Sequence, residues 1–294
     1  MKFPQSVLRC GLLGSALTIG LCSPAQAAIY GTIVGATTTY QNITETDSQI
    51  AGPPPVNSTP TALFGAPVIS PTNSDNLTFP AISFSALVAD GQFELQDGKL
   101  NFDAVPNSPT ITLHSISFDE GGGWRVDGPT GDAMSQATLL FEDLRITSVN
   151  GMALGTPIVV APTFTESIVT QNGTAQTTQG TGEDTITSTG GNADGTWDIT
   201  ASFNLDEALS INNLTGNVTG ISVALDNQLF AQTTSTEAGL TLAEIDKKHF
   251  IVSDVTTVGP TVPEPASVWM LLGTGLMLMM RSPYRALTRR RKIA

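Results

Sequence analysis

The 294-residue sequence has only two cysteines and two histidines, and this scarcity excludes several kinds of chemistry. Both cysteines, Cys10 and Cys22, lie within the first 27 residues, so the remaining chain has neither a disulfide nor a thiol nucleophile. His114 and His249 have no partner at the spacing of a helical His-Glu-x-x-His zinc motif. We expect each histidine to be a hydrogen-bonded or exposed strand residue.

Catalytic signatures are also missing from the sequence. It has no Gly-x-Ser-x-Gly nucleophile elbow and no glycine-rich phosphate-binding loop. A glycoside hydrolase would need two carboxylates that face each other across roughly 5–10 Å, and spacing along a sequence cannot show such a pair. We therefore expect a protein that is not an enzyme, with a secreted hydrolase as the less favoured alternative.

Basic residues are rare between residues 28 and 262. This stretch has five basic and 25 acidic side chains, a formal net charge of −20, whereas the whole chain carries −13. Such a charge disfavours nucleic acid and anionic lipid surfaces as partners. Divalent cations, neutral sugars and basic polymers remain possible ligands. The alternative without a ligand is an acidic surface that keeps an exported protein in solution.

The N-terminal 27 residues have the pattern of a secretory signal peptide. Lys2 and Arg9 precede an apolar stretch, and Ala25 and Ala27 supply the small residues that signal peptidase needs, which places cleavage after Ala27. A lipoprotein signal is disfavoured because Leu21 precedes Cys22, where a small residue is required. The pattern predicts export.

A second sorting pattern occupies residues 263–294. Pro263, Glu264 and Pro265 precede an apolar run, and six of the thirteen basic residues lie in the last fourteen positions. The tail ends in the cluster Arg289, Arg290, Arg291 and Lys292. This order resembles the PEP-CTERM sorting signal of Gram-negative bacteria that make extracellular polysaccharide. The resemblance covers the C-terminus alone, and it implies processing by the membrane protease-transpeptidase exosortase.

The apolar run is long enough for a membrane anchor before processing. Nineteen residues from 262 to 280 would form a helix of roughly 28 Å, close to a bilayer core of about 30 Å. The basic tail would remain cytoplasmic by the positive-inside rule. The sequence thus predicts a C-terminal transmembrane helix in the inner membrane, with the preceding body on the far side. A buried core helix with a solvated basic tail is the alternative.

The body, residues 28–262, has the pattern of an all-β protein. Short runs alternate apolar and polar residues, and long stretches of helical period are absent. We predict an antiparallel β-sandwich, with a jelly roll as one form of it. The predicted strands are 82–88, 92–96, 110–118, 137–147, 196–205, 219–225, 229–233 and 249–255. Whether the body is one β domain or two stays open, with one as the default.

Turn, cap and loop signals divide these strands. The tight-turn dipeptides are Asp90-Gly91, Asp97-Gly98, Asn150-Gly151 and Asp194-Gly195. A short helix of one or two turns is predicted within 204–211, capped by Asn or Asp. The proline-rich segment 52–80 predicts extended loop, and the Thr- and Gly-rich segment 171–195 predicts a long exposed hairpin loop or insertion.

Two ligand sites are predicted in the body. Trp124 follows three glycines, and beside Asp119 and Glu120 it could stack on a sugar ring, although a core position is favoured. The second site is for calcium, the one cofactor that the sequence allows. Its candidate ligands surround a Gly-Thr-Trp turn and are Asn192, Asp194 and Asp198.

Together these patterns predict an exported cell-envelope or extracellular-matrix protein with a non-catalytic structural or interaction role in biofilm or exopolysaccharide. Its expected partners are signal peptidase and exosortase, with matrix polysaccharide as a candidate and nucleic acid excluded. The alternative is a carbohydrate-binding module. An exposed row of aromatic side chains on one sheet face would favour that alternative, and a cleft with facing carboxylates would favour a hydrolase.

Overall fold

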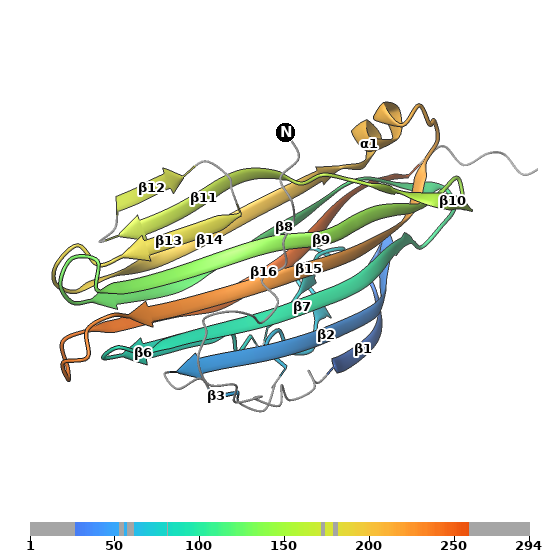
Figure 1. Ribbon diagram of the computed structural model, residues 1–294. Helices are drawn as coiled ribbons and strands as arrows, with labels where there is room; N and C mark the ends of the chain where they lie inside the picture. Colours follow the sequence, from blue (N-terminus) through green and yellow to red (C-terminus); the bar gives the residue numbers. More distant parts are fainter. Residues whose placement is uncertain are drawn as a thin grey trace, which may run out of the picture.

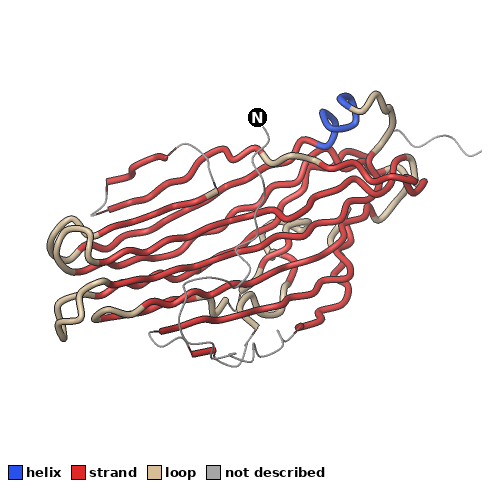
Figure 2. Tube along the Cα trace, in the orientation of Figure 1, coloured by secondary structure: helices blue, strands red, loops and turns tan. Residues whose placement is uncertain are grey.

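The structure is a computed structural model that describes residues 27–52, 56–57, 62–80, 82–171, 174–178 and 182–258. Within these residues the chain is mostly antiparallel β, as predicted, and it has a short helix at one end (Figure 2). The signal peptide, apart from Ala27, and the sorting signal at 263–294 lie outside the described residues. No helix within the described residues is long and apolar enough to cross a membrane.

Sixteen strands of very different length make up the body. They are β1 (Ala27–Val34), β2 (Thr38–Gly52), β3 (Val56–Asn57), β4 (Val68–Ile69), β5 (Leu77–Thr78), β6 (Ser85–Ala89), β7 (Phe93–Pro106), β8 (Ile111–Asp127), β9 (Ala133–Val149), β10 (Met152–Val159), β11 (Thr163–Gln171), β12 (Thr174–Thr178), β13 (Glu183–Thr187), β14 (Ala193–Asn204), β15 (Val218–Thr233) and β16 (Leu242–Val258). The helix α1 (Leu205–Ile211) lies between β14 and β15.

Antiparallel pairing arranges the strands in two sets that lie one behind the other. The first set has the order β1, β2, β7, β15, β9, with β10 and β13 paired to β9 and β3 paired to β2. The second has the order β12, β11, β14, β8, β16, with β5 and β6 paired to β16 and β4 paired to β5. Val218 of β15 pairs with Leu113 of β8, which joins the two sets. Figure 1 shows β2, β7, β15 and β9 side by side, with β8 and β16 behind them.

The hydrophobic core fills the space between the two sets. Phe118 of β8 is fully buried and contacts Phe141 of β9, with ring centroids 4.8 Å apart. Phe141 in turn lies 4.6 Å from the ring of Phe203 of β14. These edge-to-face ring contacts connect the two layers. In each strand, apolar side chains alternate with polar ones, and the apolar side chains point into the core. The layered all-β architecture follows from that alternation, while the jelly-roll connectivity stays a prediction.

All eight predicted strands overlap observed strands, and two of the four predicted turns are confirmed. Asp90 and Gly91 have φ of 52° and 79°, and Asn150 and Gly151 have φ of 51° and 74°, as a tight turn requires. The other two dipeptides lie inside strands β7 and β14. At Gly98 of β7 the ring of Phe84 would lie 2.6 Å from an added Cβ, so this glycine makes room for packing instead of forming a turn.

The predicted helix is confirmed, together with its cap. The side chain of Asn204 accepts a hydrogen bond from the backbone N–H of Glu207 at 3.0 Å. Leu205, Ala208 and Leu209 are buried, so one face of α1 packs against the body. The helix ends at Ile211, and Asn212 follows as its C-cap, with a backbone N–H that donates to the carbonyl oxygens of Ala208 and Leu209.

The prediction of plain loop for residues 52–80 is wrong in part. The segment contains the short strands β4 and β5, and it inserts Leu63 and Phe64 into the core. Their backbone N–H groups donate to buried carboxylates of β2, Leu63 to Asp47 at 3.0 Å and Phe64 to Glu45 at 2.6 Å. Proline removes backbone donors, but here side-chain acceptors from β2 hold the neighbouring non-proline residues in place.

The prediction of a long exposed hairpin loop or insertion for residues 171–195 is wrong in part, since β11 and β12 pair as a hairpin but much of the described segment is strand. The described part contains β12 and β13 and the first residues of β14. β13 pairs with the edge of β9 and buries Asp184 and Ile186. Pairing with an existing strand satisfies the hydrogen-bonding groups of the backbone. A Thr-rich segment with few apolar side chains can therefore still form a strand.

Candidate functional site

The candidate site lies on the outer face of the second set, where β14, β8 and β16 are neighbours. Gly121, Gly122 and Gly123 form the middle of β8, between a strand on each side. A Cβ on Gly122 would lie 1.7 Å from the backbone oxygen of Asp246 in β16. Only glycine fits this close approach, and the glycines leave the outer face of β8 without side chains at this point.

A β-bulge in β16 lies opposite these glycines. Lys247 pairs with Gly122 and His249 pairs with Gly121, so Lys248 is the extra residue. The bulge breaks the alternation of faces: Lys247 points inward, while Lys248 and His249 both lie on the outer side. The backbone oxygen of Asp246 just before the bulge accepts a hydrogen bond from the Trp197 indole at 3.0 Å.

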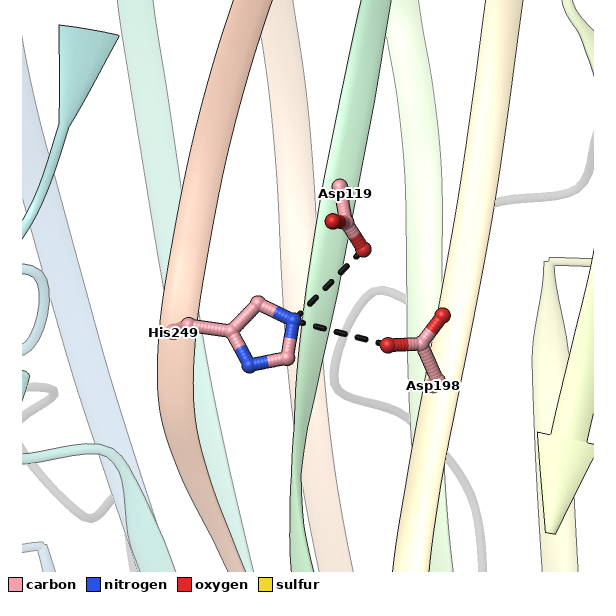
Figure 3. A group of neighbouring side chains, drawn as sticks. All are labelled: Asp119, Asp198 and His249. Carbon is pink, nitrogen blue, oxygen red and sulfur yellow. Dashed lines mark ion pairs between the residues drawn. The ribbon is translucent and has the colours of Figure 1, made fainter. Parts of the chain in front are cut away.

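Outside the sheet, the bulge brings His249 between two carboxylates. Its Nε2 lies 3.5 Å from Asp119 Oδ1 and 3.5 Å from Asp198 Oδ2 (Figure 3). One ligand atom from each residue lies within 4.8 Å of the other two. Interaction with the carboxylates of Asp119 and Asp198 raises the pKa of His249 to about 9, against the opposing effect of desolvation. At neutral pH the metal-free site therefore holds an imidazolium between two carboxylates.

A shallow polar hollow of about 220 Å³ lies further along the same face, beside Gly123. Its charged side chains are Arg125, Asp194, Glu244, Asp246 and Lys248. Asp246 accepts a hydrogen bond from the backbone N–H of Gly123 at 2.5 Å and lies 3.5 Å from the ammonium of Lys248. Such a surface offers hydrogen bonds and charges of both signs to a polar ligand.

The inner side of the same strands holds a buried ion pair. Lys247 Nζ lies 2.7 Å from Glu120 Oε2, and neither side chain has any exposed surface. The ammonium also lies over the rings of Phe84, Phe64 and Phe250, at 4.8 Å, 5.1 Å and 5.4 Å from their centroids. Burial raises the pKa of Glu120 and lowers that of Lys247, and the charge of each partner opposes the effect on the other.

The structure separates the residues of the predicted sugar site. Trp124 is 3% exposed, belongs to strand β8 instead of a mobile loop, and donates from its indole to the backbone oxygen of Thr196 at 3.2 Å. Glu120 is buried as well, whereas Asp119 lies on the outer face. A sugar ring cannot reach Trp124 here, so the stacking hypothesis is corrected in favour of the core alternative.

The predicted calcium ligands are likewise not brought together. Asp194 and Asp198 lie four residues apart along β14, which separates them by roughly 13 Å at the rise of a strand. Asp194 pairs with Arg125, and Asn192 lies beside Asp127. These three residues cannot share one ion, because Asp194 and Asp198 lie far apart along the extended strand β14 instead of curling around a turn.

Asp198 instead joins Asp119 and His249, a grouping that the sequence reasoning missed. Strand register decides it, since Asp198 and His249 lie opposite Gly121 from either side. A sequence signal did exist: two successive lysines break the alternation directly before His249, and three glycines elsewhere could accommodate a bulge. His114, by contrast, is a hydrogen-bonded strand residue as expected, 2.7 Å from Asp206 and 2.6 Å from Thr257.

Comparison with known proteins adds one finding on the chain's sorting. A PEP-CTERM protein-sorting motif matches residues 261–286, which confirms the predicted C-terminal signal. The motif implies an exported protein that exosortase sorts at the membrane, and it leaves the body undescribed. No curated protein matches the chain.

Two solved structures align with this chain at low similarity. Structures of infectious bursal disease virus, strains Gx and Gt, are each 11% identical to this chain. Each alignment covers 90% of this chain and 78% of the viral chain, at a TM-score of 0.10.

Proposed function

We propose that this chain is a cell-envelope or extracellular-matrix protein with a non-catalytic structural or interaction role in biofilm or exopolysaccharide. The observation that carries the proposal is the sorting motif at residues 261–286. The motif begins three residues after the end of β16, the last strand of the all-β body. The motif accounts for export and for exosortase as a partner. The role in the matrix is our inference from this route and from the character of the body.

The body supports a role outside the cell. It has no cysteine to oxidise, and aromatic rings in edge-to-face contact fill its core. Its net charge of −20 keeps it away from other acidic polymers unless cations mediate the contact. A rigid acidic body with polar outer faces suits a hydrated matrix.

Binding of matrix polysaccharide is the second candidate function, and the hollow beside Gly123 favours it. Its carboxylates and cations can accept and donate hydrogen bonds to hydroxyl groups. The ring-stacking mode lacks support, since no Phe, Tyr or Trp in the described part of the chain has an exposed side chain. We therefore expect weak, multivalent, polar binding instead of a stacked sugar.

The test compares cells that lack the chain with cells complemented by the parent chain. We expect the parent protein in the envelope-surface or matrix fraction, together with restored mass or cohesion of the biofilm. An unchanged biofilm in cells that lack the chain would contradict the structural role.

A second measurement addresses catalysis. Purified protein incubated with the organism's polysaccharide should release no new reducing ends, while it sediments with the polymer. Release of reducing ends that a matched buffer control does not show would replace the proposal by a hydrolase.

A further inference from the structure

We propose that Asp119, Asp198 and His249 form a binding site for a divalent transition metal of the zinc type. The three side chains come from three adjacent strands of a rigid sheet and meet above Gly121. An added Cβ on Gly121 would lie 2.6 Å from His249 Cε1 and 3.0 Å from Asp198 Oδ2, so the glycine creates the space in which they converge. The inference is independent of the role in the matrix.

The spacing of the donor atoms fits an ion with short bonds. A tetrahedral ion with bonds of about 2.1 Å separates its ligand atoms by roughly 3.4 Å. Two of the three separations in the cluster are 3.5 Å, both from His249 Nε2, and the third lies within 4.8 Å. The three-ligand set is complete when the Asp119 and Asp198 oxygens also lie about 3.4 Å apart.

One donor atom has coordination capacity that the protein leaves unused. Asp119 Oδ1 is shielded from solvent and accepts no hydrogen bond from the described residues. Its polar neighbour is His249 Nε2 at 3.5 Å, beyond the length of a good hydrogen bond. A metal ion that displaces the proton of the imidazolium would bond directly to this oxygen and to His249 Nε2, so its binding releases a proton.

The donor types select the class of metal. One imidazole and two carboxylates suit zinc and neighbouring transition metals, whereas calcium and magnesium take oxygen ligands. The side chains of Asp119, Asp198 and His249 are 45%, 39% and 39% exposed, so the remaining coordination positions face solvent. An ion bound there keeps an open position, as sites that bind a water or an external ligand do, and differs from closed structural zinc sites.

The test measures binding of Zn²⁺ to the full chain, purified in detergent and stripped of metal with a chelator. A colorimetric chelator competes for the ion and reports stoichiometry and affinity. We expect one Zn²⁺ per chain, and at least about tenfold weaker binding in His249→Gln and in Asp198→Asn, since loss of even an outer-shell partner costs a metal site that much.

Two matched controls should bind Zn²⁺ like the parent protein. His114→Gln removes the other histidine, which has a single carboxylate neighbour at 2.7 Å. Asp194→Asn removes a carboxylate from the same face of β14, four residues from Asp198. Circular dichroism confirms that each variant is folded.

Three results would overturn the proposal. They are equal Zn²⁺ affinity of the parent protein and His249→Gln, no Zn²⁺ binding by the parent protein, and tighter binding of Ca²⁺ than of Zn²⁺. The cluster would then be an ion triad only. If both site variants unfold, the absorption spectrum of the parent protein with Co²⁺ tests the site instead. Visible bands of a low-coordinate ion with nitrogen and oxygen ligands would support the metal site. Their absence would reject it.

Discussion

Glu120 and Lys247 bury opposite charges against each other in the core, with a separation of 2.7 Å between carboxylate and ammonium. The lysine follows Ala243 and Ile245 on the buried face of β16, just before the bulge at Lys248. Three phenylalanine rings surround its ammonium. A pair without exposed surface adds little net stability, but each partner depends strongly on the other.

The first prediction concerns this pair. Lys247→Met should lower the free energy of unfolding by about 3–5 kcal/mol, because it leaves Glu120 buried and unpaired. The double variant Lys247→Met/Glu120→Leu should recover most of that loss. Urea unfolding of the four proteins in the double-mutant cycle measures the coupling. Additive losses in the double variant would show that the two charges do not interact.

A second prediction concerns the close approach of β8 and β16. Gly122→Ala should destabilise the protein by at least about 2 kcal/mol, since the new methyl group would overlap the backbone oxygen of Asp246. Gly155→Ala is the matched control, because Gly155 lies on an exposed strand with nothing within 4 Å of an added Cβ. It should be neutral or stabilising by up to about 1 kcal/mol. Thermal unfolding that ranks the two variants equally would reject the steric argument.

A third prediction concerns pH and Asp47. Burial, a hydrogen bond to Glu45 and the charge of Glu45 raise the pKa of Asp47 to about 8, while the hydrogen bond from Leu63 opposes the shift. The folded protein therefore binds a proton that the unfolded chain has released above about pH 4. The stability from this group is complete below pH 4 and is lost as the pH rises through 8.

Asp47→Asn should remove this dependence. The amide can still accept from Leu63 and can donate to Glu45, so the variant should exceed the parent protein in stability at pH 9 by at least about 1 kcal/mol. The difference should shrink or reverse at pH 4. Chemical unfolding at both pH values provides the measurement, with Asp194→Asn on the exposed face as a control. The same difference at both pH values would mean that Asp47 does not titrate in this range.

A fourth prediction concerns processing. Glu264→Ala should leave an uncleaved form that retains Arg289 to Lys292, whereas the parent protein should lose this tail. Mass spectrometry of the C-terminus decides the point in cells that contain exosortase. Replacement of the basic cluster by Gln should disturb insertion and orientation instead of cleavage. An intact tail in the parent protein from such cells would contradict the processing prediction.

A fifth prediction concerns the body alone. Residues 28–262, expressed without either signal, should be soluble, monomeric and predominantly β, and should fold equally well under reducing and oxidising conditions because they contain no cysteine. Far-ultraviolet circular dichroism and gel filtration test these expectations. A spectrum dominated by helix would contradict the first, and a dependence on reducing agent would contradict the last.

Much of the fold could be predicted because it depends on local pattern. Period-two alternation located the long strands, and the cap at Asn204 and the turn at Asn150-Gly151 act within a few residues. Segments that depend on distant partners could not be predicted. The strand at 183–187 forms because β9 offers an edge, and Phe64 is held in the core by Glu45, nineteen residues earlier.

The candidate site shows the same division more strongly. Asp119 and Asp198 were singled out in two separate predicted sites, and only the register of β8 and β14 brings them together. His249 joins them because the bulge shifts the face of β16 by one residue. A sequence does not state where a bulge will lie until its partner strand is known, so the three residues could be named but not assembled.

The position of β16 also bears on the timing of folding. This strand pairs with β8 along nearly its whole length, and it ends at Val258, five residues before Pro263. An extended chain of that length reaches at most roughly 18 Å. If the chain is exported from its N-terminus, β8 keeps an unpaired edge until β16 has also crossed the membrane. On that route the described sheet can be completed only when the residues just before the sorting motif have been exported.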